Sequence, residues 1–379
     1  MKKRHLFIYS FFRPLVIAFL RLKLGYRFAV AKGLPSPYIV LSNHNTDYDP
    51  LLVGCSFKKQ MYFVTSEHVF RWKTAGRLLR YTFAPIARYK GSTASSTVME
   101  ILRTLRAGRN VCMFAEGDRS WDGVTGPILP STGKMVKSAR CALVTYRIEG
   151  GYFVSPRWSV ALRRGRLKGG PVRVYTKEEL AAMTPEEINA AINADLYENA
   201  YARQQADPAP YRGKALAEKL ETVLYDCPRC GKEGTLSSQG DELFCACGLR
   251  CRYTETGMLE GGPFQTVKEW VDWQRKKLEE QAEQGRACLH GGWAVLSAVE
   301  HHEETLVAQG QTRMDTEEFA CGERSFPVKD ITGLAMHGRN RLVFTVADGG
   351  YYELRPRQNS ENVYKYQALY QALGHVKTI

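Results

Sequence analysis

Acidic residues are scarce in the first half of this 379-residue sequence. Up to Tyr175 the chain has 8 Asp and Glu against 30 Lys and Arg, whereas from Thr176 onward it has 31 against 23. We therefore expect the first half to meet an anionic partner: phospholipid headgroups, a phosphorylated substrate or nucleic acid. A basic, well-solvated surface without a partner is the alternative.

The sequence also lacks internal repeats, low-complexity segments and a disulfide framework. With 44% hydrophobic residues, a chain of this length can bury a sizeable core in two or three domains. Five of the ten cysteines fall between Cys227 and Cys251, and the other five are scattered singly. This spacing indicates one metal site and ordinary buried thiols in a reducing compartment.

Residues 1–25 are basic and apolar, but no small-residue cleavage site of a signal peptide follows them. A spanning helix needs about 20 apolar residues, and here Arg13-Pro14 interrupts the run before Arg21 and Lys23 close it. Because Pro14 removes a helical hydrogen bond or begins a second helix, we expect a bent helix lying in the membrane interface, on the cytoplasmic face. A packed helix of a soluble domain and a true spanning segment are the alternatives.

Short apolar runs alternate with helical stretches between Tyr38 and Tyr175. Runs rich in Val, Tyr and Phe predict strands at "YIVLS", "MYFVTS", "NVCMFAE", "ALVTYRIEG" and "PVRVYT". Residues 92–108 predict a helix that Ser95 or Ser96 caps and Gly108 ends. Strands that alternate with helices predict an α/β layer architecture.

The stretch "IVLSNHNTDYDP" at residues 39–50 places His44, Asp47 and Asp49 directly after an apolar strand. When a carboxylate holds one ring nitrogen of a histidine, the other can take a proton. His44 and Asp49 are five residues apart, so they pair only if His44 precedes the helix that Pro50 favours. Pro50 also pushes Asp49 out of helical dihedrals. Asp47 is the competing partner, and a capped surface turn explains the same residues as well.

A second stretch, "NVCMFAEGDRSWDG", again runs from an apolar strand into polar residues, namely Glu116, Gly117, Asp118, Arg119 and Ser120. Gly117 allows a tight turn, and the Arg119 fork can bind a phosphate through two hydrogen bonds. Between the two stretches, "FAPIARYKGS" places Arg88 and Lys90 after another strand. Three strand ends that carry a base and several cations predict a site for a phosphorylated alcohol.

The order N-H-x4-D, an arginine segment, F-x-E-G-x-R-S and a strand like "LVTYRIEGGY" resembles the glycerolipid acyltransferase family. Its best-known members are the 1-acyl-sn-glycerol-3-phosphate acyltransferases, and the resemblance covers Gly25 to Tyr175. It implies a mixed sheet flanked by helices, with His44 as catalytic base and Asp49 as its orienting partner. It also implies a substrate-binding set consisting of Arg88, Lys90, Glu116, Gly117, Arg119 and Ser120.

The resemblance implies transfer of a fatty acyl group from acyl-CoA or acyl-carrier protein to 1-acyl-glycerol-3-phosphate, which forms phosphatidic acid. Two positions depart from the family pattern: Ala115 stands where proline is usual, and Asp118 where threonine is usual. An acidic residue beside a phosphate site lowers affinity unless it points away or pairs with a cation. Another lysophospholipid or a lipid alcohol is therefore the alternative acceptor. Backbone N–H groups near the strand ends are the expected oxyanion donors.

The segment "CPRCGKEGTLSSQGDELFCACGLRC" predicts a metal site, and its first half resembles a zinc knuckle. We expect tetrahedral zinc held by four thiolates, which leave no open position and make the metal structural. The expected ligands are Cys227, Cys230, Cys245 and Cys247, and Cys251 could replace Cys245 or Cys247. Because zinc ribbons often bind nucleic acid, a nucleic-acid-binding protein is the alternative of another class. The ribbon lies in the acidic half, without an aromatic-basic array nearby, which argues against that alternative.

The remaining segments complete the predicted domain organisation. Residues 213–225 predict a short helix that leads into the cysteines. A charged amphipathic helix with Trp270 and Trp273 follows. The last 90 residues predict successive strands and a closing helix that resemble a pleckstrin-homology-like domain, and a generic small β domain is the alternative. The expected domains are an interfacial helix (1–25), an acyltransferase domain (26–205), a zinc ribbon (206–262), a connecting helix (263–289) and a β domain (290–379).

Overall fold

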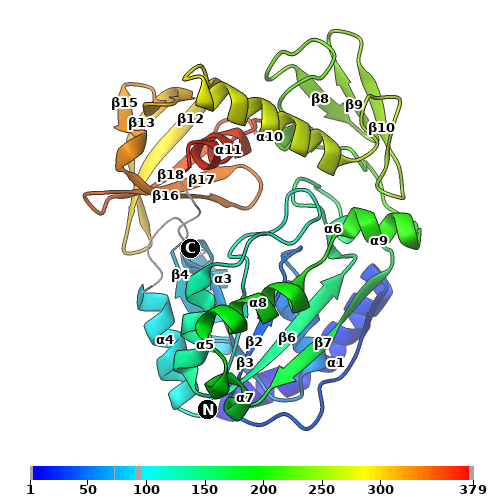
Figure 1. Ribbon diagram of the computed structural model, residues 1–379, viewed down its shortest axis with the longest axis vertical. Coiled ribbons are helices and arrows are strands. Elements are labelled where there is room, and N and C mark those ends of the chain that lie inside the picture. Colours follow the sequence, from blue (N-terminus) through cyan, green and yellow to red (C-terminus); the bar gives the residue numbers. More distant parts are fainter. Residues whose placement is uncertain (1–2, 72, 90–94, 375–379) are drawn as a thin grey trace. The chain divides into compact units, whose positions relative to one another are not determined.

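The computed structural model describes residues 3–71, 73–89 and 95–374, and the chain divides into two compact units. Unit 1 is Met1–Arg88, Ala94–Arg157 and Leu162–Arg212, and unit 2 is the remainder, chiefly Gly213–Ile379. Figure 1 shows the helices and strands of both units. Each unit is described by itself below.

A seven-stranded mixed sheet forms the centre of unit 1, in the order β1-β7-β6-β2-β5-β3-β4. Only β6 and β7 pair antiparallel, and the other described neighbours pair in parallel. All five residues of β2 are buried, as expected for a central parallel strand covered on both faces. The strands are β1 (Tyr26–Phe28), β2 (Tyr38–Ser42), β3 (Met61–Ser66), β4 (Ile86–Arg88), β5 (Asn110–Phe114), β6 (Ala142–Glu149) and β7 (Leu167–Tyr175).

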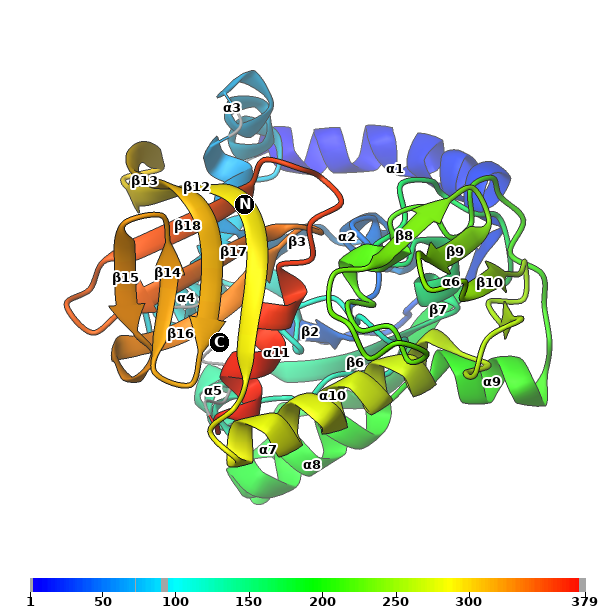
Figure 2. The ribbon, with the colours of Figure 1, turned by 90° about the horizontal axis from the view of Figure 1, so that it is seen from above.

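Helices cover both faces of this sheet, which confirms the predicted α/β architecture. Helices α5, α7 and α8 lie on one face, and α1 and α2 lie on the other (Figure 2). Ile39 and Leu41 of β2 share a buried apolar cluster with Ile188 and Ile192 of α8. The helices are α1 (Lys3–Leu24), α2 (Asp49–Ser56), α3 (Lys73–Thr82), α4 (Ser95–Arg106), α5 (Pro130–Ala139), α6 (Gly151–Val154), α7 (Lys177–Ala182), α8 (Pro185–Leu196) and α9 (Ala200–Ala206).

Helix α1 packs against the sheet unit through one face. Pro14 lies inside a single continuous helix, so no second helix begins there. The Tyr9 hydroxyl donates to the carbonyl oxygens of Gly54 (2.6 Å) and Phe57 (2.8 Å), and the Arg13 guanidinium donates to that of Cys55. The last carbonyls of a helix lack intrahelical hydrogen-bond donors. At the end of α2, side chains of α1 supply these donors.

The other face of α1 is apolar and exposed. Phe7, Phe11 and Leu22 are 70%, 58% and 73% exposed. By length and composition alone, Arg4–Leu24 is the one helix of the described residues long and apolar enough to cross a membrane. Helix α1 is therefore attached to unit 1 through one face and exposes large apolar side chains on the other.

Unit 2 begins with a four-stranded antiparallel sheet, ordered β11-β10-β9-β8. The helix predicted over 213–225 is wrong, and a 3-10 turn, Leu220–Thr222, lies within this segment. Ala215 and Lys219 have φ values of 53° and 72°, which an α-helix does not tolerate, and the Lys219 amide donates to the Ser238 hydroxyl at 2.7 Å. The strands are β8 (Leu236–Gln239), β9 (Glu242–Cys245), β10 (Arg250–Tyr253) and β11 (Leu259–Glu260).

A second antiparallel sheet of seven strands completes unit 2, in the order β15-β14-β13-β12-β18-β17-β16. The predicted strands and closing helix are confirmed, whereas the likeness to a pleckstrin-homology-like domain stays a prediction. Trp270 of the connecting helix α10 (Val267–Glu283) is buried and donates to the Asp226 carbonyl at 2.9 Å. The remaining elements are β12 (Cys288–Glu300), β13 (Glu303–Asp315), β14 (Glu318–Cys321), β15 (Arg324–Pro327), β16 (Ile331–His337), β17 (Arg341–Val346), β18 (Tyr351–Pro356) and α11 (Tyr364–Ala372).

Candidate active site

The two polar stretches singled out in the sequence meet at one edge of the unit 1 sheet. Strands β2 and β5 are parallel neighbours, with Ser42 opposite Phe114. Their carboxyl ends therefore open on the same side, where open α/β sheets bind ligands. His44 follows one strand and Glu116 the other, and the chain segments are joined where Ser120 N–H donates to the His44 carbonyl at 3.1 Å.

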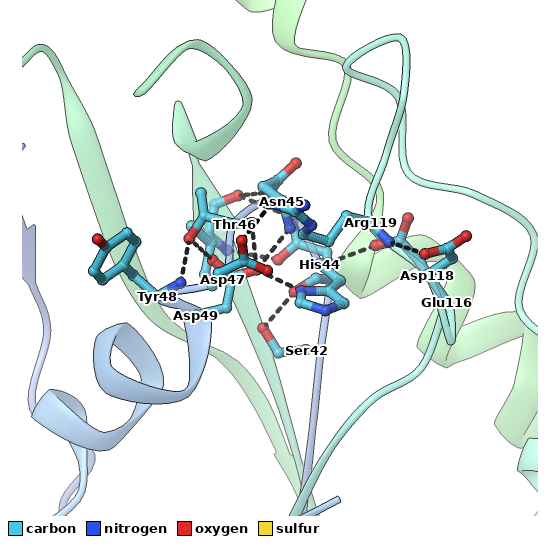
Figure 3. A network of polar contacts seen from close by, with 12 residues as sticks. Ser42, His44, Asn45, Thr46, Asp47, Tyr48, Asp49, Glu116, Asp118 and Arg119 are labelled. Carbon is cyan, nitrogen blue, oxygen red and sulfur yellow. Dashed lines mark hydrogen bonds and ion pairs between the residues drawn. The ribbon is translucent and has the colours of Figure 1, made fainter. Parts of the chain in front are cut away.

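His44 pairs with Asp49, as the sequence predicts. The distance from His44 Nδ1 to Asp49 Oδ2 is 2.7 Å (Figure 3). The imidazole stacks on the Phe114 ring with 4.4 Å between centroids. The Asp49 carboxylate is fully buried, and the His44 side chain is 19% exposed. None of the described residues hydrogen-bonds the second ring nitrogen, Nε2. The pair thus holds the ring by one nitrogen and leaves the other for a ligand proton.

The Asp49 carboxylate is fixed by the loop that it closes. Oδ2 accepts hydrogen bonds from the amides of Asn45 (2.6 Å) and Thr46 (2.9 Å), and Oδ1 accepts one from the Thr46 hydroxyl (2.6 Å). Helix α2 begins at Asp49 itself, so Pro50 does not push this residue out of the helix as expected. His44 does precede the helix, which is what allows a pair five residues apart.

Glu116 ties the two strand-end loops together. One carboxylate oxygen accepts the His44 amide and the other accepts the Gly126 amide, each at 2.6 Å. The turn that follows passes through Gly117 at φ 67°, a conformation that glycine adopts without strain. Substrate binding by Glu116 stays a prediction, and its contacts within the chain position the backbone of His44.

Asp118, one of the two departures from the family pattern, forms an ion pair with Arg157. Arg157 Nη1 lies 2.6 Å from Asp118 Oδ1, and both side chains are buried. The same guanidinium donates to the Arg119 carbonyl at 3.0 Å and lies 4.0 Å from the centre of the Trp121 ring. Because Asp118 is paired inside the unit, its charge is offset before any ligand approaches.

Arg119 also meets a carboxylate, but one on the surface. Its Nη1 lies 3.2 Å from Asp47 Oδ2, and the two side chains are 8% and 77% exposed (Figure 3). Burial lowers the pKa of Arg119, and the negative charge of Asp47 opposes that shift. Asp47 is therefore not the partner of His44, and Arg119 is the partner that the sequence did not reveal.

The remaining predicted substrate-binding residues are Ser120, Arg88 and Lys90. Ser120 is buried in the turn, where its hydroxyl accepts the Gly123 amide at 2.9 Å. Arg88 ends β4, two strands away from β5 at the same edge of the sheet, and is buried. Lys90 lies outside the described residues.

Backbone amides of the two loops are already engaged. The amides of Asn45 and Thr46 serve Asp49, that of His44 serves Glu116, and that of Arg119 donates to Asp118 Oδ1 at 3.0 Å. These four are therefore not the oxyanion donors that we expected at the strand ends.

Sequence reasoning missed two residues that hold the site. Asn43 bridges to β6, since its side chain accepts the Ile148 amide (2.8 Å) and donates to the Ile148 carbonyl (2.9 Å). Arg157 lies 39 residues beyond Asp118, and no local pattern connects the two. Asn43 sits within the recognised N-H-x4-D motif, so its position carried a signal, whereas Arg157 offered none.

The predicted metal site lies in unit 2. The sulfurs of Cys227, Cys230, Cys245 and Cys247 all lie within 4.8 Å of one another. The Cys227–Cys247 and Cys230–Cys245 pairs are 3.6 and 3.9 Å apart. Tetrahedral zinc with Zn–S bonds of about 2.3 Å separates its sulfurs by about 3.8 Å, so this donor set fits zinc.

Cys251 is not one of the converging cysteines. Its thiol is buried beside Gly262, where a Cβ atom would meet the sulfur at 2.4 Å. Burial raises the pKa of Cys251 to about 11, which keeps it a neutral thiol. Its environment is that of an ordinary buried cysteine.

Comparison with known proteins supports an acyltransferase domain in unit 1. The family model described as "Acyltransferase" matches residues 29–149, about a third of the chain. No curated protein matches. Among solved structures, the crystal structure of the 1-acyl-sn-glycerophosphate (LPA) acyltransferase, PlsC, from Thermotoga maritima is similar at 16% identity and a TM-score of 0.42, over 52% of this chain and 81% of that one.

Proposed function

We propose that this protein moves a fatty acyl group from a thioester donor to the free hydroxyl of 1-acyl-glycerol-3-phosphate, forming phosphatidic acid. The observation that carries the proposal is the buried Asp49 carboxylate 2.7 Å from His44 Nδ1, with the His44 side chain 19% exposed. The acyltransferase match over residues 29–149 includes both residues. Acyl-CoA and acyl-carrier protein are the two candidate donors.

In this mechanism His44 acts as a general base. Nε2 takes the proton of the acceptor hydroxyl as its oxygen attacks the thioester carbonyl carbon. Asp49 stabilises the imidazolium that forms and keeps Nδ1–H as the donor between the two side chains. The tetrahedral intermediate then collapses, its C–S bond breaks, and the imidazolium returns the proton to the leaving thiolate. No acyl-enzyme forms.

The acceptor phosphate would bind at the loop after β5. Arg119 offers a planar fork suited to phosphate, and the carboxylate of Asp118 beside it is offset by Arg157. Arg88 and Lys90 are proposed to contribute from the third strand end. The pairing of Asp118 removes one objection to a phosphorylated acceptor.

We further propose that α1 lies in a membrane interface. Its exposed Phe7, Phe11 and Leu22 would enter the acyl boundary, while Arg21 and Lys23 in its last turn would meet headgroups. A spanning orientation would remove Tyr9 and Arg13 from the carbonyls of α2, and those donors would be costly to bury unpaired in lipid. The interfacial orientation keeps these contacts.

The cysteine cluster is proposed to hold one structural zinc. Four thiolates at tetrahedral spacing complete its coordination and leave no position for a substrate. The proposed domain organisation is unchanged: 1–25, 26–205, 206–262, 263–289 and 290–379.

An acyl-transfer assay on the full chain tests the function. The purified protein is given acyl-CoA or acyl-carrier protein and a panel of lysophospholipids together with a neutral monoacylglycerol. We expect phosphatidic acid from 1-acyl-glycerol-3-phosphate as the main product. Faster transfer to another acceptor would replace the substrate, and transfer to none of them would contradict the proposal.

A further inference from the structure

Asp47 and Asp49 lie two residues apart in the same loop, but only Asp49 serves His44. Asp47 is 77% exposed and contacts the guanidinium of Arg119, the group proposed to bind the acceptor phosphate. The proposed mechanism gives Asp47 no role. Its carboxylate nevertheless lies on the arginine that is proposed to bind the phosphate.

The other carboxylates near Arg119 are already committed. Asp118 is paired with Arg157 at 2.6 Å, and Asp49 is held by His44 and two backbone amides. Asp47 is therefore the carboxylate at this site that faces both solvent and Arg119 (Figure 3). An incoming phosphate and Asp47 would seek the same cation.

Arg119 itself is 8% exposed, and Asp47 is the exposed member of the pair. A phosphate must either move the Asp47 side chain aside or bind beside it and be repelled. Both routes weaken phosphate binding. Neither route affects the acyl-transfer step, because the His44 ring is positioned by Asp49.

We infer that Asp47 is a specificity-determining residue, which competes with the acceptor phosphate for Arg119. It lowers the preference of the enzyme for phosphorylated over unphosphorylated acceptors of the same acyl chain. The inference rests on the proposed function in one respect, namely that Arg119 binds the acceptor phosphate.

The kinetic test compares the full-length wild type with Asp47→Asn on two acceptors, 1-acyl-glycerol-3-phosphate and the matching 1-monoacylglycerol. Because the pair is partly buried, we expect the KM for the phosphorylated acceptor to fall roughly three- to tenfold. The kcat should change less than about twofold, and the KM for monoacylglycerol should stay the same. A KM for the phosphorylated acceptor that stays unchanged or rises in Asp47→Asn overturns the inference.

Asp207→Asn is the matched control. Asp207 is also an exposed aspartate of unit 1 paired with an arginine, Arg166, but it lies at the end of α9. This variant makes the same change of charge away from the site. An equal fall in KM with Asp207→Asn would assign the effect to the general surface charge and overturn the inference.

A binding measurement separates the inference from the proposed function. The affinity of the full chain for glycerol 3-phosphate is measured calorimetrically without any acyl donor. We expect Asp47→Asn to bind about three- to tenfold more tightly than wild type, and Arg119→Gln to lose binding. This result with an inactive wild type would refute the acyl transfer and keep the inference. Binding that is equal in wild type and Asp47→Asn, or absent in both, overturns the inference.

Discussion

The strand-end loops of unit 1 and the cysteine cluster of unit 2 both bring ionisable side chains together, but these side chains are paired in different ways. In the loops, Asp49, Glu116 and Asp118 are each bonded to donors within the chain, and the exposed Asp47 contacts Arg119. In the cluster, four sulfurs face one another at 3.6 to 3.9 Å. The carboxylates of the loops are therefore paired within the chain, whereas the four sulfurs of the cluster are placed where they could hold a metal ion.

This difference predicts which changes affect folding and which affect activity. Loss of the metal should unfold the cluster and leave the loops intact. Loss of His44 should stop the chemistry and leave the whole fold intact. Loss of Arg157 should fall between the two, because it breaks a buried pair that supports the loop.

The largest expected effect follows removal of zinc. In zinc-finger peptides the metal contributes on the order of 10 kcal/mol, because binding and folding are coupled. We expect about one zinc per chain, and chelation or Cys230→Ser should abolish hydrogen-exchange protection over residues 227–253. Cys251→Ser is the control and should retain the metal. Less than about half an equivalent of zinc in gently purified protein would contradict the assignment.

The next effect concerns the buried pair between Arg157 and Asp118. Arg157→Met removes the guanidinium 2.6 Å from the buried Asp118 carboxylate, which should lower the free energy of unfolding by about 3–5 kcal/mol. Chemical denaturation measures the change, and adding Asp118→Asn to the same chain should recover most of it. An unchanged midpoint for Arg157→Met would show that this pair does not support the loop.

A smaller effect is expected at α1. Serine at both Phe7 and Phe11 removes two exposed aromatic rings, each worth about 1.5–3 kcal/mol if fully buried. Because interfacial burial is partial, we expect the affinity of the double variant for anionic phospholipid vesicles to be roughly tenfold lower, as measured by vesicle flotation. Leu306→Ser is the control, since Leu306 is 61% exposed in unit 2. Equal loss in the control would argue against an interfacial α1.

Local patterns in the sequence predicted much of the fold. Runs rich in Val, Tyr and Phe marked β2, β3, β5, β6 and β7 of the unit 1 sheet. The pairing of His44 with Asp49 was also predictable, since it depends on a short loop and a following proline. These features depend on residues close together in the chain.

Features set by distant contacts were not predictable. The segment 213–225 has a helical composition, but its amides bond to β8 and the turn after it, and tertiary hydrogen bonds outweigh its propensity. Arg157 could not be linked to Asp118, nor Arg119 to Asp47, because the fold alone brings them together. Glu116 was recognised as a site residue, yet its bonds to the amides of His44 and Gly126 depend on how the fold brings these segments together.

The most direct test of the central claim is the turnover of His44→Ala. We expect kcat for acyl transfer to 1-acyl-glycerol-3-phosphate to fall by about 10²–10⁴, the usual contribution of a general base. The variant should keep the wild-type unfolding midpoint and vesicle binding. It loses the stacking of the His44 ring on Phe114, but Asp49 retains its bonds to the loop amides. Wild-type turnover in folded, vesicle-bound His44→Ala would contradict the account.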